Sequence, residues 1–348
     1  MSIEVSEDLG GPAQPLLTVK NLVKHFPIRG GLLGRTTGLV QAVDGVDFDV
    51  AKGETLGIVG ESGCGKSTTA RLLIRLIEPD SGEVLFDGQA LGAVDGGITL
   101  TELRRQVQMV FQDSFASLNP RLTIEDSIAF GPKVHGVPDG EARGRARDLL
   151  GKVGLDPNLF GRRYPHELSG GQRQRVNIAR ALALAPRLVL LDESVSALDK
   201  SVEAQVLNLL QDLKSEFGLT YVFISHDLNV VRYMADRVMV MYLGRVAEIG
   251  PVEELYDNPR HPYTRALLSA MPSMDPDHRT QEAPIAGDPP NPINPPSGCR
   301  FHTRCPFAED VCGAKIPALT PTLADPGHRV ACHMADSSSG HSKAGSAS

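Results

Sequence analysis

Short, mainly apolar runs recur along the chain at residues 54–60, 187–192 and 219–225. Such runs are typical of parallel strands that are covered on both faces. Stretches with helical periodicity alternate with them at residues 66–77, 171–185 and 202–214. This alternation predicts an α/β fold with a mainly parallel sheet. The last stretch places five apolar residues on one helical stripe: Val202, Val206, Leu209, Leu210 and Leu213.

The pattern changes in three other places. Residues 16–26 and 40–50 alternate as strands do, and the Gly-rich residues 27–38 between them are expected to form a long loop. Between about residues 113 and 180 the pattern is mostly helical, which predicts a helical subdomain inserted between two strands. The predicted domains are a disordered leader (1–15), a main domain (16–258), a Cys-rich C-terminal domain (259–335) and a disordered tail (336–348).

The composition is that of a globular protein, with 41% hydrophobic and 22% charged residues in 348. A net charge of -7 argues against binding to nucleic acid or to anionic lipid. No apolar segment approaches the roughly 20 residues of a membrane span, and Met1–Asp8 lacks the features of a secretion signal. We therefore expect a cytoplasmic chain whose cysteines are reduced.

A phosphate-binding loop is predicted where a strand ends and a helix begins. Residues 60–67 read GESGCGKS, which fits the pattern G-x-x-x-x-G-K-S/T in the required context. The loop amides and the helix N-terminus favour phosphate, Lys66 would reach the β- and γ-phosphates, and Ser67 would bind Mg²⁺. Cys64 is either incidental or a redox switch. The residues expected to contact nucleotide are Gly60, Ser62, Gly63, Cys64, Gly65, Lys66, Ser67 and Thr68.

Two further polar elements follow apolar strands. Asp192 and Glu193 end the run at 187–192, and His226 follows the run at 219–225. Ligands of doubly wound sheets bind at the carboxyl ends of the strands. We expect Asp192 to hold Mg²⁺ through water, Glu193 to polarise the attacking water and His226 to bond the γ-phosphate.

Leu168-Ser-Gly-Gly-Gln172 lies between these elements, and with them the chain resembles the nucleotide-binding subunits of ABC transporters. By itself the pentapeptide indicates only a helix capped by Ser169. The resemblance implies a P-loop ABC ATPase domain with an antiparallel β subdomain, an inserted helical subdomain and a small Cys-rich extension. It also assigns Gln112 to catalysis and Mg²⁺ binding, Asp199 to the nucleotide site and Phe26 to stacking on adenine.

The resemblance implies a mechanism in which two subunits pair head to tail around ATP. Ser169, Gly170, Gly171 and Gln172 of one subunit would complete the γ-phosphate site of the other. Hydrolysis would then open the pair. Ser194 departs from the family, which usually has proline there, and this leaves open a non-hydrolysing subunit. Intact Glu193 and His226 favour hydrolysis.

Within that family the chain is most similar to ATPase subunits of oligopeptide and dipeptide importers, nearest the F type of dipeptide permeases, over residues 16–334. Such a subunit lies at the cytoplasmic face of the membrane. Its implied partners are a second ATPase subunit, as a heterodimer, two permease subunits that dock on residues 113–132, and an extracytoplasmic peptide-binding protein. The alternatives are importers of nickel, glutathione or sugars, and a soluble ABC ATPase outside transport.

Four late cysteines, Cys299, Cys305, Cys312 and Cys332, lie in a Pro-rich segment with little capacity for a core. They favour a Cys₄ metal site that staples the segment. Their irregular spacing suits a [4Fe–4S] cluster better than zinc, and the resemblance implies such a cluster; zinc and metal-free structural thiols remain alternatives. Four nearby cations could offset its charge: Arg300, Arg304, Lys315 and Arg329. Three histidines are expected to be solvated: His302, His328 and His333.

Overall fold

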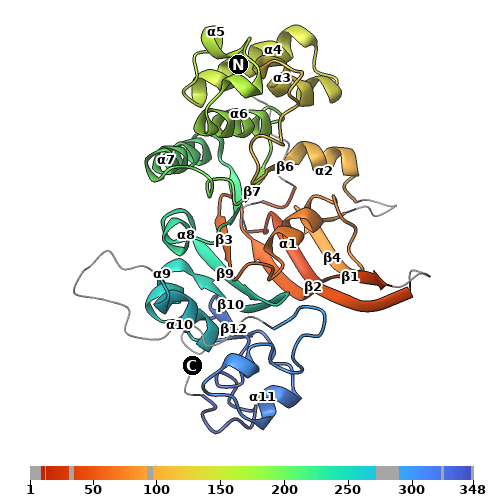
Figure 1. Ribbon diagram of the computed structural model, residues 1–348, viewed down its shortest axis with the longest axis vertical. Helices are drawn as coiled ribbons and strands as arrows, with labels where there is room; N and C mark the ends of the chain where they lie inside the picture. Colours follow the sequence, from red (N-terminus) through yellow and green to blue (C-terminus); the bar gives the residue numbers. More distant parts are fainter. Residues whose placement is uncertain are drawn as a thin grey trace. The chain divides into compact units, whose positions relative to one another are not determined.

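The computed structural model describes residues 9–11, 13–30, 35–91, 97–271, 290–322 and 325–345. The chain forms two compact units, each assembled from separate stretches of sequence. The first unit contains Met1–Thr18, Asp49–Thr55 and Leu85–Ser225, and the second contains Val19–Phe48, Leu56–Val84 and His226–Ser348. Figure 1 labels their helices and strands. No helix in the described ranges has the length and apolar character that a membrane span requires.

The first unit has a core of three parallel strands. β7 (Leu188–Asp192) pairs with β6 (Val107–Val110) on one side and with β8 (Thr220–Ile224) on the other. Every residue of β7 and β8 is buried, as their apolar sequences predict. α2 (Leu100–Gln106) leads directly into β6, and the short β5 (Gln89–Ala90) pairs with the end of β4 (Ser81–Phe86).

A group of helices occupies the part of this unit where the sequence predicts an inserted helical subdomain (Figure 1). α3, α4 and α6 pack against one another, and α7 packs on α6. Thr123 caps α3 by accepting from the amide of Asp126. The helices are α3 (Ile124–Val134), α4 (Asp139–Lys152), α5 (Pro157–Phe160), the 3₁₀ turn η1 (Pro165–Glu167), α6 (Gly170–Leu182) and α7 (Lys200–Phe217).

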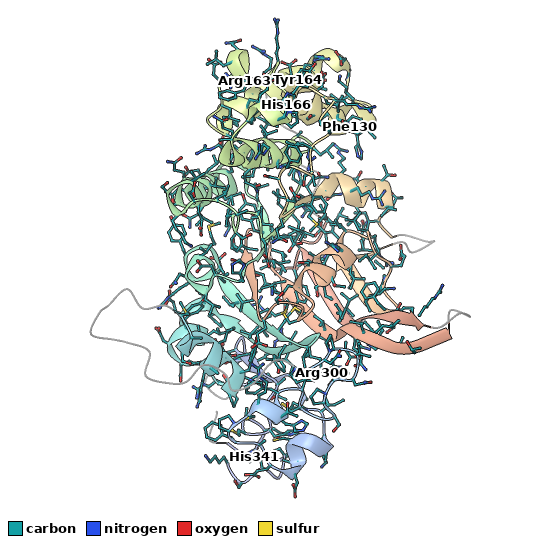
Figure 2. The ribbon with its side chains drawn as sticks, in the orientation of Figure 1. Phe130, Arg163, Tyr164, His166, Arg300 and His341 are labelled. Carbon is teal, nitrogen blue, oxygen red and sulfur yellow. The ribbon has the colours of Figure 1, made fainter. Side chains whose placement is uncertain are left out.

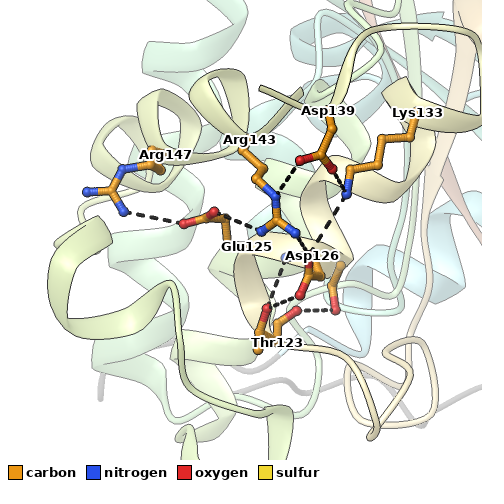
Figure 3. A network of polar contacts seen from close by, with 8 residues as sticks. Thr123, Glu125, Asp126, Lys133, Asp139, Arg143 and Arg147 are labelled. Carbon is orange, nitrogen blue, oxygen red and sulfur yellow. Dashed lines mark hydrogen bonds and ion pairs between the residues drawn. The ribbon is translucent and has the colours of Figure 1, made fainter. Parts of the chain in front are cut away.

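Ion pairs join α3 to α4 at their polar edge (Figure 3). The Arg143 guanidinium contacts Glu125 at 3.1 Å, Asp126 at 2.7 Å and Asp139 at 2.9 Å. Arg147 adds a second cation beside Glu125 at 3.3 Å. The two helices pack against each other, and the network links their polar edges at the surface.

In the second unit β1 (Leu17–Gly30) lies between β2 (Arg35–Val50) and β4. Both long strands continue into the Gly-rich segment, so the long loop expected over residues 27–38 is wrong; residues 31–34 lie outside the described part. Gly30 lies close to Thr37, where an added Cβ would be 2.9 Å from its side chain. Small residues therefore let the two strands extend well beyond their apolar parts.

The rest of the second unit is built on β3 (Thr55–Val59), whose four residues from Leu56 pair in parallel with β9 (Arg237–Tyr242). β9 pairs antiparallel with β10 (Arg245–Pro251), and β10 pairs with β12 (Arg329–Val330) of the Cys-rich region. The Cys-rich region is thus attached through backbone pairing. The remaining elements are α1 (Lys66–Leu73), α8 (Leu228–Met234), α9 (Val252–Asp257), α10 (Pro262–Ser269), η2 (His302–Arg304), α11 (Asp310–Ala314) and β11 (Thr320–Pro321).

The structure describes residues 9–11 and 13–15 of the predicted leader and residues 336–345 of the predicted tail. The Leu9 amide donates to the buried carboxylate of Asp87 at 3.0 Å. At the other end His341 is buried, with Nε2 2.9 Å from the Phe307 carbonyl, and Ser342 donates its amide to Glu309 at 2.9 Å. Small polar residues predict disorder only when nothing nearby satisfies their polar groups. Residues 1–8, 12 and 346–348 lie outside the described part.

Candidate functional site

The predicted phosphate loop connects β3 to α1, as the motif requires. Gly60 has a φ of 148°, and a Cβ there would lie 2.2 Å from the Met241 carbonyl oxygen. Gly65 has a φ of 109°, and its Cβ would lie 2.2 Å from the carbonyl oxygen of Ala42. Only glycine fits either position, because both backbone conformation and space exclude a side chain. The loop therefore packs closely against the backbone at Met241 and Ala42.

Lys66 begins α1 and folds back over the loop. Its side chain is buried, and Nζ donates to the Gly60 carbonyl at 2.8 Å and to the Glu61 carbonyl at 3.1 Å. Ser67 and Thr68 follow in the first turn and are half-buried. An ammonium group held within a Gly-rich loop at a helix N-terminus suits the oxygens of a polyphosphate.

Cys64 lies beneath this loop and is 2% exposed. Burial raises the pKa of its thiol, which favours the protonated form. Thiolate is the form that reacts with oxidants, and access is also needed. Of the two interpretations of Cys64, the structure favours the incidental one: a small residue that fills space under the loop.

The predicted catalytic carboxylate follows β7. Asp192 ends the strand and is buried, and Glu193 has the left-handed φ of 46° that few non-glycine residues adopt. The Nε2 amide of Gln112, two residues after β6, donates to Oε2 of Glu193 at 2.9 Å. The next residue, Ser194, is 4% exposed, and its hydroxyl has no hydrogen-bond partner in the described part of the chain. The structure thus brings together Gln112 and Glu193, which lie far apart in sequence.

Ser169 caps α6, as the sequence predicts. Its hydroxyl accepts from the Gln172 amide at 3.3 Å, and the Gln172 side chain accepts from the Ser169 amide at 3.0 Å. Ser169 is exposed, while Gly170 and Gly171 are half-buried in the first turn. A Cβ on Gly171 would lie 2.5 Å from Cγ1 of Val202 in α7. Glycine at position 171 therefore permits the close approach of α7 to the first turn of α6.

Three other predicted residues lie at the surface. His226, just beyond β8, and Asp199, which precedes α7, are exposed, and Phe26 in β1 is half-buried. The Lys24 ammonium lies 5.6 Å from the centre of the Phe26 ring. The predicted site residues are divided between the two compact units. The second unit contains Phe26, the phosphate loop and His226. The first unit contains Gln112, the Ser169 turn, Asp192, Glu193 and Asp199. The roles of all these residues remain predictions.

The expected metal site at Cys299, Cys305, Cys312 and Cys332 is wrong. The four thiols line one small cavity, but among the described residues no group of three or more His, Cys, Asp or Glu side chains is arranged to hold a metal ion. The residues therefore fit neither a [4Fe–4S] cluster nor zinc. Burial raises the pKa of Cys299 to about 11 and that of Cys332 to about 12, which favours the protonated form of these two thiols.

Cys332 belongs instead to a small apolar cluster. Cys332 packs with Val330 and Met334, and Phe307 covers them. Two of the three arginines expected to balance a cluster pair with carboxylates: Arg300 (Figure 2) contacts Asp44, and Arg304 contacts Glu61. A segment rich in proline can thus build a small core from sulfur and aromatic side chains, which periodicity alone does not reveal.

Two of the three histidines expected to be solvated are buried. His328 is 1% exposed and its Nε2 lies 2.7 Å from Oε1 of Glu248, and His333 lies 2.9 Å from the Lys315 carbonyl. His302 is half-buried, with Nδ1 2.8 Å from the carbonyl of Cys299. The buried Glu248 carboxylate also accepts the backbone amides of Arg260 and His261. The burial of His328 follows from this partner on β10, which no local sequence signal identifies.

Two protein-family models match stretches of this sequence. Residues 43–196 match the model of the ABC transporter family, and residues 247–312 match the oligopeptide/dipeptide transporter C-terminal region. Two solved structures are similar to this chain. The first is cbiO1 of Clostridium perfringens, part of an ABC transporter complex, with a TM-score of 0.59 and 29% identity, and the match covers 70% of this chain and 91% of that one. The other is the ATP-binding cassette MJ0796 bound to ADP and phosphate, with a TM-score of 0.58, 30% identity and coverage of 68% and 98%.

These matches define the class as P-loop ABC ATPases, and they confirm the fold and the enzyme class expected from the sequence. The oligopeptide transport ATP-binding protein AppF of Bacillus subtilis is 51% identical over 92% of this chain and 98% of its own length. The di/tripeptide transport ATP-binding protein DppF of Pseudomonas aeruginosa is 48% identical over 93% and 98%. The chain belongs to this family of peptide-transporter ATP-binding proteins. As an ABC ATPase it uses ATP.

Proposed function

We propose that this protein hydrolyses ATP to power the import of oligopeptides or dipeptides through a membrane transporter. The observation that carries the proposal is the similarity to AppF and DppF, which extends over more than nine-tenths of the chain and includes the C-terminal region. A general ABC ATPase would match over the nucleotide-binding part alone.

The proposed ATP site uses the loop amides and Lys66 for the β- and γ-phosphates and stacks adenine on Phe26. Ser67, Gln112 and Asp192 would hold Mg²⁺, which neutralises phosphate charge when bound. Glu193 orients and polarises the attacking water, and His226 bonds the γ-phosphate. The Gln112 amide supports this role, because its hydrogen bond at 2.9 Å orients the Glu193 carboxylate.

The second half of the site would come from a partner ATPase subunit, which we propose is a different chain. Ser169, Gly170, Gly171 and Gln172 of one subunit would bind the γ-phosphate held by the other, with Asp199 nearby. The exposure of Ser169 at a capped helix start supports this arrangement, because its amides and dipole favour an anion. Closure around ATP and opening after hydrolysis would supply the mechanical stroke.

Two permease subunits and an extracytoplasmic peptide-binding protein would complete the transporter, with this chain at the cytoplasmic face of the membrane. Residues 113–132 are the proposed docking surface for the permeases. Phe115 and Phe130 support it, because their side chains are 53% and 60% exposed (Figure 2 labels Phe130). Exposed aromatic groups of this size are typical of protein interfaces.

The test is reconstitution of the whole transporter with its binding protein in vesicles. We expect internal peptide to accumulate with ATP, and we expect Lys66→Ala to abolish accumulation while the complex still assembles. Stimulation of the ATPase by peptide-loaded binding protein should accompany transport. Stimulation by nickel or glutathione in place of peptide would contradict the proposed solute while keeping the ATPase.

A further inference from the structure

Glu61, the second residue of the phosphate loop, is held at several points. Its carbonyl oxygen accepts from Lys66 Nζ at 3.1 Å and from the Cys64 amide at 3.2 Å. Its own amide donates to the Tyr263 hydroxyl oxygen at 2.9 Å. Its carboxylate contacts Arg304. The first two contacts are internal to the loop, and the other two come from the region that follows β10.

The contact with Arg304 is close and shielded from solvent. Nη1 lies 3.1 Å and 2.9 Å from the two carboxylate oxygens of Glu61, and the two side chains are 6% and 22% exposed. The same Nη1 lies 3.2 Å from the Tyr242 hydroxyl. Hydrogen bonds to Glu61 and Tyr242 oppose the effect of burial, and the pKa of Arg304 is raised. Arg304 therefore remains charged and offsets the negative charge of Glu61.

Three packed aromatic rings hold the residues that contact Glu61 in place. The rings of Tyr242 and Tyr263 lie 4.6 Å apart, and Phe301 lies 5.4 Å from each. Tyr263 is fully buried, so its hydroxyl has a defined position beneath the Glu61 amide. Phe301 immediately precedes η2, which ends at Arg304. The packing of Phe301 thereby sets where the Arg304 guanidinium can reach.

We propose that Arg304 and Tyr263 are positioning residues of the ATP site, which make the C-terminal region part of the nucleotide-binding machinery. Arg304 neutralises a carboxylate that would otherwise repel the phosphates of ATP, and Tyr263 holds the Glu61 backbone in the loop conformation that Lys66 needs. The inference rests on the proposed ATP site and adds to it a dependence on a segment that lies beyond the nucleotide-binding motifs.

The test compares KM and kcat for ATP in the full chain, together with nucleotide affinity by fluorescence titration. We expect Arg304→Ala to raise both KM and the dissociation constant about 3- to 10-fold, because it leaves the Glu61 charge unpaired. The change in kcat should be smaller. Glu61→Gln combined with Arg304→Ala should restore both values to within about twofold of the Glu61→Gln single variant. Arg304→Lys should show an intermediate effect, since lysine keeps the positive charge and lacks the planar guanidinium group.

Arg232→Ala is the matched control, because Arg232 forms exposed ion pairs with Glu253 and Asp257 in the same unit. It should leave KM unchanged. Equal KM in wild type and Arg304→Ala would overturn the proposal, as would a loss that Glu61→Gln does not restore. A wild-type chain that binds ATP without hydrolysing it would instead count against the proposed function, and the binding comparison among variants would still decide the role of Arg304.

Discussion

Gln112 and Glu193 share a hydrogen bond of 2.9 Å although they are separated by 81 positions in the chain. Each follows a strand of the same parallel group, Gln112 after β6 and Glu193 after β7. Adjacent parallel strands bring the residues that follow them to a common edge. The fold therefore holds the Gln112 side-chain amide against the Glu193 carboxylate.

Replacement of that carboxylate should separate binding from turnover. We expect Glu193→Gln to lower kcat at least about 100-fold, because the amide cannot accept a proton from water. Nucleotide affinity should remain within a few-fold of wild type, and an ATP-bound dimer should accumulate. Steady-state hydrolysis and size-exclusion chromatography with ATP measure the two effects, and undiminished hydrolysis would reject Glu193 as the catalytic group.

Ser194 offers a test of stability beside the same carboxylate. Its buried hydroxyl has no partner in the described residues, and an unsatisfied buried hydroxyl costs about 1 kcal/mol or more. Ser194→Ala removes this cost and leaves only a small change in volume. We expect the Tm to rise by about 2 °C in thermal unfolding. A fall in Tm would show that the hydroxyl has a stabilising partner.

His261 should make stability depend on pH. Burial lowers its pKa to about 4 from 6.5, although the nearby Glu248 opposes this effect. Between these values the unfolded chain binds a proton that the folded chain excludes. The contribution of His261 is therefore complete above about pH 6.5 and is lost as the pH falls to about 4, with a size on the order of 2–3 kcal/mol.

The matched variant is His261→Asn, because asparagine can still cap α10 in place of the Nδ1 that accepts from the Tyr263 amide. We expect unfolding by urea at pH 4.5 and pH 7 to show a smaller difference for the variant than for wild type. Equal differences would mean that other groups carry the acid sensitivity. Arg265, which also lowers the pKa of His261, keeps its charge across this range and does not add to the slope.

Gly171 tests the contact between α6 and α7. Alanine normally stabilises a helix relative to glycine by about 0.5–1 kcal/mol, but here its Cβ would lie 2.5 Å from Val202 Cγ1. We expect Gly171→Ala to lower the free energy of unfolding by about 1–3 kcal/mol. Gly170→Ala meets only an ordinary contact, 3.8 Å from Leu198, and should be neutral or stabilising.

Val202→Ala in the Gly171→Ala background supplies the second arm, because it removes the atom in the way. The double variant should lose less free energy of unfolding than the sum of the losses in the two single variants, which chemical denaturation can measure. Strict additivity would show that α6 and α7 separate easily and that the close approach stores little energy.

The sequence predicted what local spacing determines. The phosphate loop, the Ser169 cap and the buried β7 and β8 each depend on residues that are neighbours in the chain, so their patterns predicted the fold class correctly. The extension of β1 and β2 and the burial of His328 depend on contacts with distant strands. Those contacts have no local signal, and propensity alone cannot anticipate them.

The error at the cysteines has a different origin. Four cysteines in a Pro-rich segment have the same sequence pattern whether they bind metal or pack against Phe307 and Met334. The difference lies in the side chains that surround the thiols, which is a property of the folded chain. In the same way, Arg304 stood out as a cation, but its partner Glu61 could be found only in the structure.

The buried His341 changes how the end of this chain should be treated in the laboratory. His341, labelled in Figure 2, lies with its ring Nε2 against the Phe307 carbonyl and lines the same cavity as the four thiols. Removal of the polar stretch after Ala335 would expose the cavity that the cysteines line to solvent. It would also remove the contact between His341 and the Phe307 carbonyl. Protein shortened in this way would be expected to oxidise and to aggregate on storage, for reasons unrelated to nucleotide.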